Sequence, residues 1–312
     1  MGPLLLVLVA ALWAMSFGLI RNRLAGLDPT IVACLRTLLA FLVFLPFLRL
    51  RTTTLRVGLE LGAIGAVQFG LMYLCYQSSF HYLQAHQVAL LTITTPCFVA
   101  LLGALAERRW TNGGILAACL AVAGTALISQ APGELDCSLR GLVLVQLSNV
   151  CFAAGQVAFR WSAHRRSAHL DSHAMAWGYL GAVLILLPWS IPPLLSSGFH
   201  PTLPQLVVLA YLGIVASGLG FFLFNAGARR SSLPVLAVLN NAKIPLAVVV
   251  SVVVFGETID LARTALGILL FLPALYLAGR TEFARPPRVS DLTGLFISSV
   301  FFASTCTMDL IW

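Results

Sequence analysis

A single lysine stands in a strongly apolar stretch of this chain, and its chemistry is the first clue to function. The stretch reads VLNNAKIPLAVVVSVVVFGE, in which Lys243 is the only lysine of 312 residues and Asn240 lies three positions before it. Residues three apart share one face of a helix. An ammonium group beside an amide can bind a carboxylate or a phosphate through charge-assisted hydrogen bonds. We therefore predict that this stretch binds an anionic group.

The composition places this lysine in a membrane. Hydrophobic residues make up 59% of the chain, charged residues only 10%, and the mean hydropathy is +0.94. A soluble domain carries about 25% charged residues. We expect an all-α polytopic membrane protein, because helices satisfy their own backbone in lipid and the apolar segments do not alternate as barrel strands do. The ten predicted transmembrane helices are 3–20, 30–48, 57–76, 85–105, 113–130, 141–160, 172–195, 203–224, 234–255 and 261–279.

The basic residues predict how these helices are oriented. With a cytoplasmic N-terminus, thirteen basic residues fall in inside segments, four fall outside, and Arg36 and Lys243 lie within spans. Basic residues are enriched in cytoplasmic loops, so both ends of the bundle are predicted to face the cytoplasm at the cell inner membrane. The tail is apolar and short, and Asp309 would be costly at depth. We favour a tail that does not cross, as an interfacial or disordered end, over a partial eleventh span.

The two halves of the chain resemble each other. Pro96 aligns with Pro245 at an offset of 149, and Glu107 with Glu257 at 150. Because each repeat would have five helices, an odd number, the second must enter the membrane in the opposite direction. Inverted repeats commonly bind substrate near the midplane, where they meet. The predicted units are a first repeat over residues 1–140, a second repeat over 141–280, and a C-terminal tail over 281–312.

The opening LWAMSFGLIRNRLAGLDPTIVACLRTLLAFLVFLPFL resembles that of EamA-type members of the drug/metabolite transporter superfamily. The matching features are Trp13, Ser16, Asp28-Pro29, Arg36 and Ala40. The resemblance covers about residues 3–280 and implies a ten-helix, inverted-repeat transporter of small organic solutes. Arg36 lies about 9 Å from the outer end of its span, where it could reach the surface or bond carbonyls, and we favour a structural role. The expected structural residues are Arg36, Pro96, Pro245, Glu107 and Glu257.

Lys243 is predicted to lie close to the membrane midplane, about 13 Å in from Pro234 at 1.5 Å per residue. A lysine there costs about 2.5–3.5 kcal/mol. Its counterpart in the first repeat is Thr94, and a charge present in only one repeat points to substrate rather than to scaffold. We favour a cation that binds an anionic substrate. The alternatives are a lysine held by carbonyls and amide or hydroxyl side chains, or a neutral lysine. Asn241 is about 100° from Asn240 and is expected to bond a neighbouring helix.

Other polar and aromatic residues lie deep in the predicted spans. Gln68, Met72 and Tyr76 follow i, i+4, i+8 spacing, and Gln87 and Thr94 lie two turns apart on one face. The alternative for each is a hydrogen bond that only packs helices together. The predicted substrate-binding residues are Lys243, Asn240, Thr94, Gln87, Tyr76, Gln68, Trp13, Gln156 and Asn225.

The remaining chemistry excludes several classes of function. We find no catalytic constellation, metal-ligand spacing or phosphate-binding loop, so we expect no enzyme, cofactor, metal or nucleic-acid partner. No acidic residue lies deep in the ten spans, which disfavours a proton-coupled exporter of organic cations. The expected partners are the lipid bilayer and a small anionic or zwitterionic molecule.

These observations predict an inner-membrane transporter of a small carboxylate-bearing metabolite. An amino acid or an acidic vitamin such as biotin would fit, carried by alternating access around a midplane site. The alternative is an exporter of amphipathic or neutral metabolites or drugs, in which Lys243 is structural. The sequence leaves open the direction of transport, the coupling ion and the oligomeric state.

Overall fold

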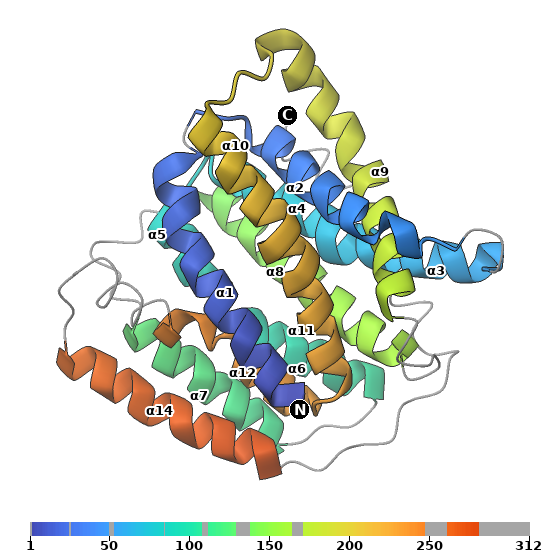
Figure 1. Cartoon of the computed structure of the whole chain (residues 1–312). Coiled ribbons are helices and arrows are strands. Elements are labelled where there is room, and N and C mark those ends of the chain that lie inside the picture. The colour runs from blue at the N-terminus through green and yellow to red at the C-terminus, as the bar shows by residue number, and fades with distance from the viewer. Residues whose placement is uncertain are drawn as a thin grey trace.

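The part of the chain that the structure describes is helical apart from its turns (Figure 1). In this computed structural model it comprises residues 2–24, 26–49, 53–83, 85–107, 112–128, 138–163, 171–246 and 261–280. No strand occurs within these residues. The predicted all-α class is therefore confirmed, while the division into ten spans and two inverted repeats stays a prediction.

The elements of the first half are α1 (Gly2–Arg23), α2 (Pro29–Phe44), η1 (Leu45–Phe47), α3 (Leu55–Gly65), η2 (Ala66–Leu71), α4 (Met72–Ser79), α5 (Ala85–Thr92), α6 (Thr95–Glu107) and α7 (Asn112–Ile128). Those of the second half are α8 (Leu139–Ala163), α9 (Asp171–Ser197), α10 (Leu203–Ala210), η4 (Tyr211–Leu219), α11 (Gly220–Arg229), α12 (Leu233–Asn240) and α14 (Leu261–Arg280).

Five helical stretches of the described chain are long and apolar enough to cross a membrane. They are Pro29–Phe47, Leu55–Ser79, Leu139–Ser162, Asp171–Ser197 and Leu203–Arg229. Shorter apolar helices lie at Gly2–Ala14, Thr95–Ala106, Asn112–Leu127, Leu233–Leu246 and Thr264–Arg280.

Capping residues determine where two of the helices begin. A carboxylate oxygen of Asp28 accepts hydrogen bonds from the backbone N–H groups of Thr30 and Ile31, at 2.9 and 3.2 Å. The hydroxyl of Ser232 accepts in the same way from the N–H of Val235 at the start of α12. Such caps satisfy donors that the first turn of a helix leaves without a partner. The Asp-Pro pair near the start of the sequence therefore marks the beginning of α2.

Two long helical stretches contain a π-helical segment. The six-residue η2 joins α3 to α4, and the nine-residue η4 joins α10 to α11. A π-helix forms i→i+5 hydrogen bonds, so each turn holds more residues than the 3.6 of an α-helix. Side chains beyond the segment are therefore rotated relative to the faces that an unbroken α-helix would present.

Two other helical stretches are broken in the middle. α5 ends at Thr92 and α6 begins at Thr95, while α12 ends at Asn240 and a helical turn begins again at Lys243. In transporters, non-helical backbone at membrane depth is tolerated where it is buried in protein or lines a cavity. The two breaks thus point to the part of the bundle where a site is expected.

Side chains bond the backbone at these breaks. The amide of Asn149 donates to the carbonyl oxygen of Leu91 at 2.9 Å. The amide of Asn241 donates to the carbonyl oxygen of Ile93 at 2.7 Å and to the hydroxyl of Thr125 at 3.1 Å. Asn241 thereby joins one broken helix to the other, which confirms that it bonds a neighbouring helix.

The paired prolines of the two halves follow the two breaks. Pro96 is the second residue of α6, and Pro245 lies in the turn that begins again after α12. Proline is tolerated in a first helical turn, where its missing N–H would have no partner. Glu257 and the tail 281–312 lie outside the described residues, as does the side chain of Glu107.

Helices from the two halves pack against each other in reciprocal pairs. α1 contacts α11 and α8 contacts α4, while α2 contacts η4 and α9 contacts η2. α7 and α14, which end the two halves, lie side by side at the edge of the bundle (Figure 1). Within the described residues, the largest apolar cluster draws on helices of both halves, namely α1, α2, α3, η2, α4, α6, α7, α8, α9, α11, α12 and α14.

Glycines allow α9 to approach α3 and η2 closely. A Cβ atom added at Gly181 would overlap the backbone of Gly62, and one added at Gly65 would overlap the backbone of Gly178. Small residues at such crossings are typical of membrane helices, because association in lipid depends on close packing.

Candidate functional site

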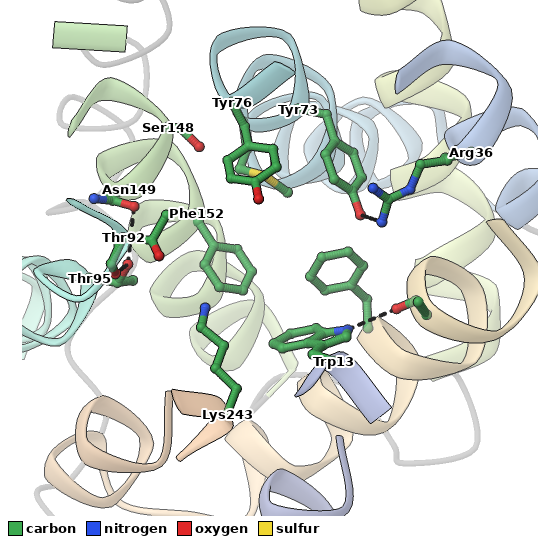
Figure 2. A pocket seen from close by; sticks show the side chains of 13 residues that line it. Trp13, Arg36, Tyr73, Tyr76, Thr92, Thr95, Ser148, Asn149, Phe152 and Lys243 are labelled. Carbon is green, nitrogen blue, oxygen red and sulfur yellow. Dashed lines mark hydrogen bonds between the residues drawn. The ribbon is translucent and has the colours of Figure 1, made fainter. Parts of the chain in front are cut away.

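A cavity lies between helices from both halves of the chain (Figure 2). Its volume is about 110 Å³, which leaves room for several water molecules at ~10–15 Å³ each. The lining residues are Trp13, Arg36, Met72, Tyr73, Tyr76, Thr92, Thr95, Ser148, Asn149, Phe152, Ala216, Phe221 and Lys243.

The side chain of Lys243 extends into this cavity, and Figure 2 shows its amine pointing toward Phe152. The residue is 9% exposed, and its Nζ lies 5.9 Å from the centre of the Trp13 ring, within the range of a cation–π contact. In the described part of the chain, no carboxylate forms an ion pair with it and no group forms a hydrogen bond to it. The ammonium hydrogens are thus available to an acceptor in the cavity.

Aromatic rings form the wall beside the lysine. The indole N–H of Trp13 donates to the carbonyl oxygen of Ala216 at 2.9 Å, which fixes the orientation of the ring. The Trp13 ring centre lies 5.0 Å from that of Phe221 and 6.1 Å from that of Phe152. Aromatic surfaces of this kind favour methylene groups or a flat ring of a ligand.

A second cation lines the cavity on another side, where Figure 2 shows Arg36 bonded to Tyr73. The Nη2 of Arg36 donates to the Tyr73 hydroxyl at 2.8 Å and to the Ser217 hydroxyl at 3.2 Å, and those two hydroxyl oxygens are 2.9 Å apart. Arg36 therefore bonds hydroxyl groups rather than carbonyls. The hydroxyl of Tyr179 donates to the carbonyl oxygen of Ser217 at 2.7 Å and fixes this part of η4.

Hydroxyl and amide groups form a third side of the cavity. The hydroxyl of Thr95 donates to the carbonyl oxygen of Thr92 at 2.6 Å and lies 3.2 Å from the amide oxygen of Asn149. Figure 2 shows these groups with Ser148 on the side of the cavity away from Arg36. Thr92 and Thr95, which flank the break between α5 and α6, therefore bring polar groups to the cavity.

Three of the predicted substrate-binding residues line the cavity together: Lys243, Trp13 and Tyr76. They come from three different helical stretches, so only the packing of the bundle brings them together.

Four others form two buried hydrogen-bonded pairs away from the cavity lining. The amide of Gln68 donates to the amide oxygen of Asn225 at 2.9 Å, and the amide of Asn240 donates to that of Gln156 at 3.2 Å. Asn240 and Lys243 do not continue one helix face, because α12 ends between them.

The i, i+4, i+8 spacing of Gln68, Met72 and Tyr76 does not bring all three to the cavity. Gln68 lies inside the π-helical η2, whereas Met72 and Tyr76 follow it in α4 and line the cavity. The additional residues in a π-helical turn shift the later side chains away from the face of the earlier ones.

The predicted common face of Gln87 and Thr94 is wrong, because α5 ends at Thr92. The hydroxyl of Thr94 lies 2.8 Å from the amide oxygen of Gln146 and 2.9 Å from the carbonyl oxygen of Leu91. Gln87 is buried on α5, outside the cavity lining.

Sequence reasoning missed much of the lining. The residues it did not select are Tyr73, Thr92, Thr95, Ser148, Asn149, Phe152, Ala216 and Phe221. A signal existed for some of them, since the pairs of hydroxyl and amide residues in TITT and SN interrupt apolar spans. No signal could identify Tyr73, because the π-helical turn just before it decides where it points.

Residues 1–130 and 139–307 each match the model of the EamA-like transporter family. The chain belongs to that family. The match reaches residue 307, beyond the residue 280 at which the resemblance in sequence was expected to end. As an EamA-like transporter, the chain is a multi-pass membrane protein and not an enzyme.

Two named relatives agree with this membership, and a solved structure shares the fold. The transporter is 36% identical over 285 residues to the probable biotin transporter of Pseudomonas aeruginosa, covering 89% of this chain and 98% of the relative. It is 34% identical over 295 residues to the biotin transporter of Escherichia coli K12, covering 92% and 96%. A crystal structure at 17% identity superposes with a TM-score of 0.71 over 89% of this chain and 94% of the other, which shows a common fold.

Proposed function

We propose that this EamA-like transporter carries biotin across the cell inner membrane. Its relatives at 36% and 34% identity are named as biotin transporters. The observation that carries the proposal is the amine of Lys243, which faces a cavity and has neither an ion pair nor a hydrogen bond within the described part of the chain.

The chemistry of biotin fits this cavity. Biotin has a carboxylate at the end of a chain of four methylene groups, and a fused ring system at the other end. The carboxylate neutralises Lys243, which compensates the cost of a buried cation. The methylene chain packs against the rings of Trp13, Phe152 and Phe221. The substrate thus supplies a counter-charge that no described lining residue provides.

Replacing Lys243 with methionine tests the proposal. Methionine keeps an unbranched side chain but removes the charge. Because removing one partner of a buried ion pair costs about 3–5 kcal/mol, we expect uptake of labelled biotin to fall at least about 100-fold, while the protein still accumulates in the membrane. Uptake into cells that lack another biotin carrier measures the effect, and fluorescence-detected gel filtration measures accumulation.

Two variants serve as controls. Lys243→Arg keeps a cation and should retain part of the uptake, while Arg56→Gln removes an exposed charge on α3 and should leave uptake unchanged. If Lys243→Met carries biotin with normal affinity, the carboxylate site is wrong. If the unaltered protein carries no biotin, the substrate is wrong. If Lys243→Met fails to accumulate, a structural lysine and the exporter alternative gain support.

We further propose that transport occurs by alternating access between two inverted five-helix repeats. The reciprocal contacts of α1 with α11 and of α8 with α4 support this, since they join helices that would be equivalent in the predicted repeats. So does the cavity, to which both halves contribute residues. The repeats then rock around the cavity, which opens to one side of the membrane at a time.

A further inference from the structure

The cavity holds two buried cations, and a substrate with one carboxylate neutralises only one of them. Arg36 is 5% exposed and Lys243 is 9% exposed. The two residues approach the cavity from different sides in Figure 2. No aspartate or glutamate is among the lining residues. One carboxylate at Lys243 therefore leaves open which group of the substrate Arg36 recognises.

The cluster around Arg36 has more hydrogen-bond donors than acceptors. Its Nη2 donates to the hydroxyls of Tyr73 and Ser217, and those hydroxyls share one hydrogen bond with each other. That bond uses one of the two hydroxyl hydrogens and leaves the other without an acceptor in the described part of the chain. The Nε–H of Arg36 is buried and has no partner there either. Guanidinium groups donate and cannot accept, so the cluster calls for an acceptor atom.

The two cations differ in how far their charge is already compensated. Arg36 bonds two hydroxyls, and its Cζ lies 4.6 Å from the centre of the Tyr73 ring. Lys243 has only a distant aromatic contact with Trp13 at 5.9 Å. A full negative charge therefore gains more at Lys243, and a neutral carbonyl is sufficient at Arg36.

We propose that Arg36 and Tyr73, which line the cavity and are held by the buried Ser217 behind them, form a second subsite. This subsite binds the ureido carbonyl of biotin while Lys243 binds its carboxylate. This inference rests on the proposed function and adds the orientation of the substrate. It gives Arg36 a role in specificity, in addition to the helix contacts that it makes through Tyr73 on α4 and Ser217 on η4.

An analogue with the opposite hydrogen-bonding character tests this subsite. In 2-iminobiotin a protonated C=NH₂⁺ group replaces the ureido carbonyl, so the ring offers donors and a positive charge where biotin offers an acceptor. Biotin methyl ester keeps the ureido group and lacks the carboxylate. Competition by each compound against labelled biotin uptake measures recognition at each end of the substrate separately.

The unaltered transporter should prefer biotin over 2-iminobiotin by at least about 100-fold, because the analogue loses charge-assisted bonds and adds repulsion. In Arg36→Gln the glutamine side chain accepts as well as donates, so this preference should fall to less than about 10-fold. The preference for biotin over its methyl ester should persist in Arg36→Gln. In Lys243→Met, where biotin uptake is too low for competition, thermal shift of the purified protein by each compound should show no preference for biotin over its methyl ester. Arg56→Gln is the matched control and should keep both preferences.

Two results would overturn the subsite. One is an unchanged preference over 2-iminobiotin in Arg36→Gln. The other is a loss of discrimination against the methyl ester in that variant, which would place the carboxylate at Arg36. If Arg36→Gln does not accumulate, Tyr73→Phe and Ser217→Ala take its place. Each should lower the preference over 2-iminobiotin several-fold, and unchanged preferences in both would reject the subsite.

The failure of this inference differs from the failure of the proposed function. If the unaltered protein carries no labelled biotin, the proposed substrate is wrong and the subsite falls with it. If it carries biotin and the variants change neither preference, the transporter stands and only the orientation of the substrate is rejected.

Discussion

At the scale of single residues, amide side chains bond the backbone where helices break. Asn149 bonds the carbonyl of Leu91, and Asn241 bonds the carbonyl of Ile93. Carbonyls released at such breaks need donors within the bundle, because an unsatisfied group costs several kcal/mol in lipid, and the hydroxyl of Thr94 also donates to the carbonyl of Leu91. These asparagines therefore allow broken helices to exist at membrane depth, and the broken helices bring polar groups to the cavity.

Asn241→Leu should lower the thermal stability of the protein, because it removes two buried hydrogen bonds. It removes the bonds to the carbonyl of Ile93 and the hydroxyl of Thr125, each worth about 1 kcal/mol between membrane helices. We expect an apparent unfolding temperature several degrees lower in detergent, measured by thermal shift. Asn112→Leu, at an exposed position on α7, is the control. Equal stability of the two variants would show that the Asn241 bonds contribute little.

At the scale of elements, α9 and α3 cross at glycines, and this close contact positions the helical stretch whose later residues line the cavity. Gly62 and Gly65 lie against Gly181 and Gly178, with no side chain between the two backbones. η2 begins just after this crossing and is followed by α4, which carries Tyr73 into the cavity. The close approach of α9 therefore fixes the helix from which part of the site is built.

Gly181→Leu should disrupt this crossing. Its Cβ would overlap the backbone of Gly62, which cannot move as a flexible side chain can, and overpacking typically costs about 1–3 kcal/mol or more. We expect lower accumulation and earlier thermal unfolding. Gly279→Leu on α14, where nothing lies within 4 Å of an added Cβ, should behave like the unaltered protein. Normal stability of Gly181→Leu would mean that the two helices can separate freely.

At the scale of the whole molecule, the distribution of charge predicts how the helices are oriented in the membrane, and helix packing determines which side chains face one another. The arginines predict which side of each helix faces the cytoplasm, while contacts between the halves determine what lies between the helices. An ion pair of 3.2 Å joins Asp171 on α9 to Arg229 on α11. In the predicted orientation this pair lies on the cytoplasmic side, where it ties two helices of the second half together.

Reporter fusions test the predicted orientation. Alkaline phosphatase, which is active only outside the cytoplasm, should be active when fused after His200 and inactive when fused after Arg280. A cytoplasmic fluorescent reporter should give the opposite pattern. The physical reason is the excess of arginine in the predicted inside segments, thirteen against four. Activity of the phosphatase after Arg280 would mean that the number of spans or the orientation is wrong.

Composition and spacing were enough to infer the class of the protein and to single out Lys243. Composition is sufficient for the class, because a chain with 10% charged residues cannot cover a soluble surface. Lys243 could be found without a structure, since a lone lysine deep in an apolar stretch is costly and needs a reason. Pro96 and Pro245 predicted that the two halves are related, and both lie just after a break.

Which side chains meet depends on the packing of the folded bundle. The π-helical η2 separates Gln68 from Tyr76, and the end of α12 separates Asn240 from Lys243. Helix periodicity assumes a constant 3.6 residues per turn, so each irregular turn invalidates the faces predicted beyond it. Irregular turns form because packing and side-chain bonds in the folded bundle stabilise them. Those contacts join residues far apart in the chain, which local sequence spacing cannot show.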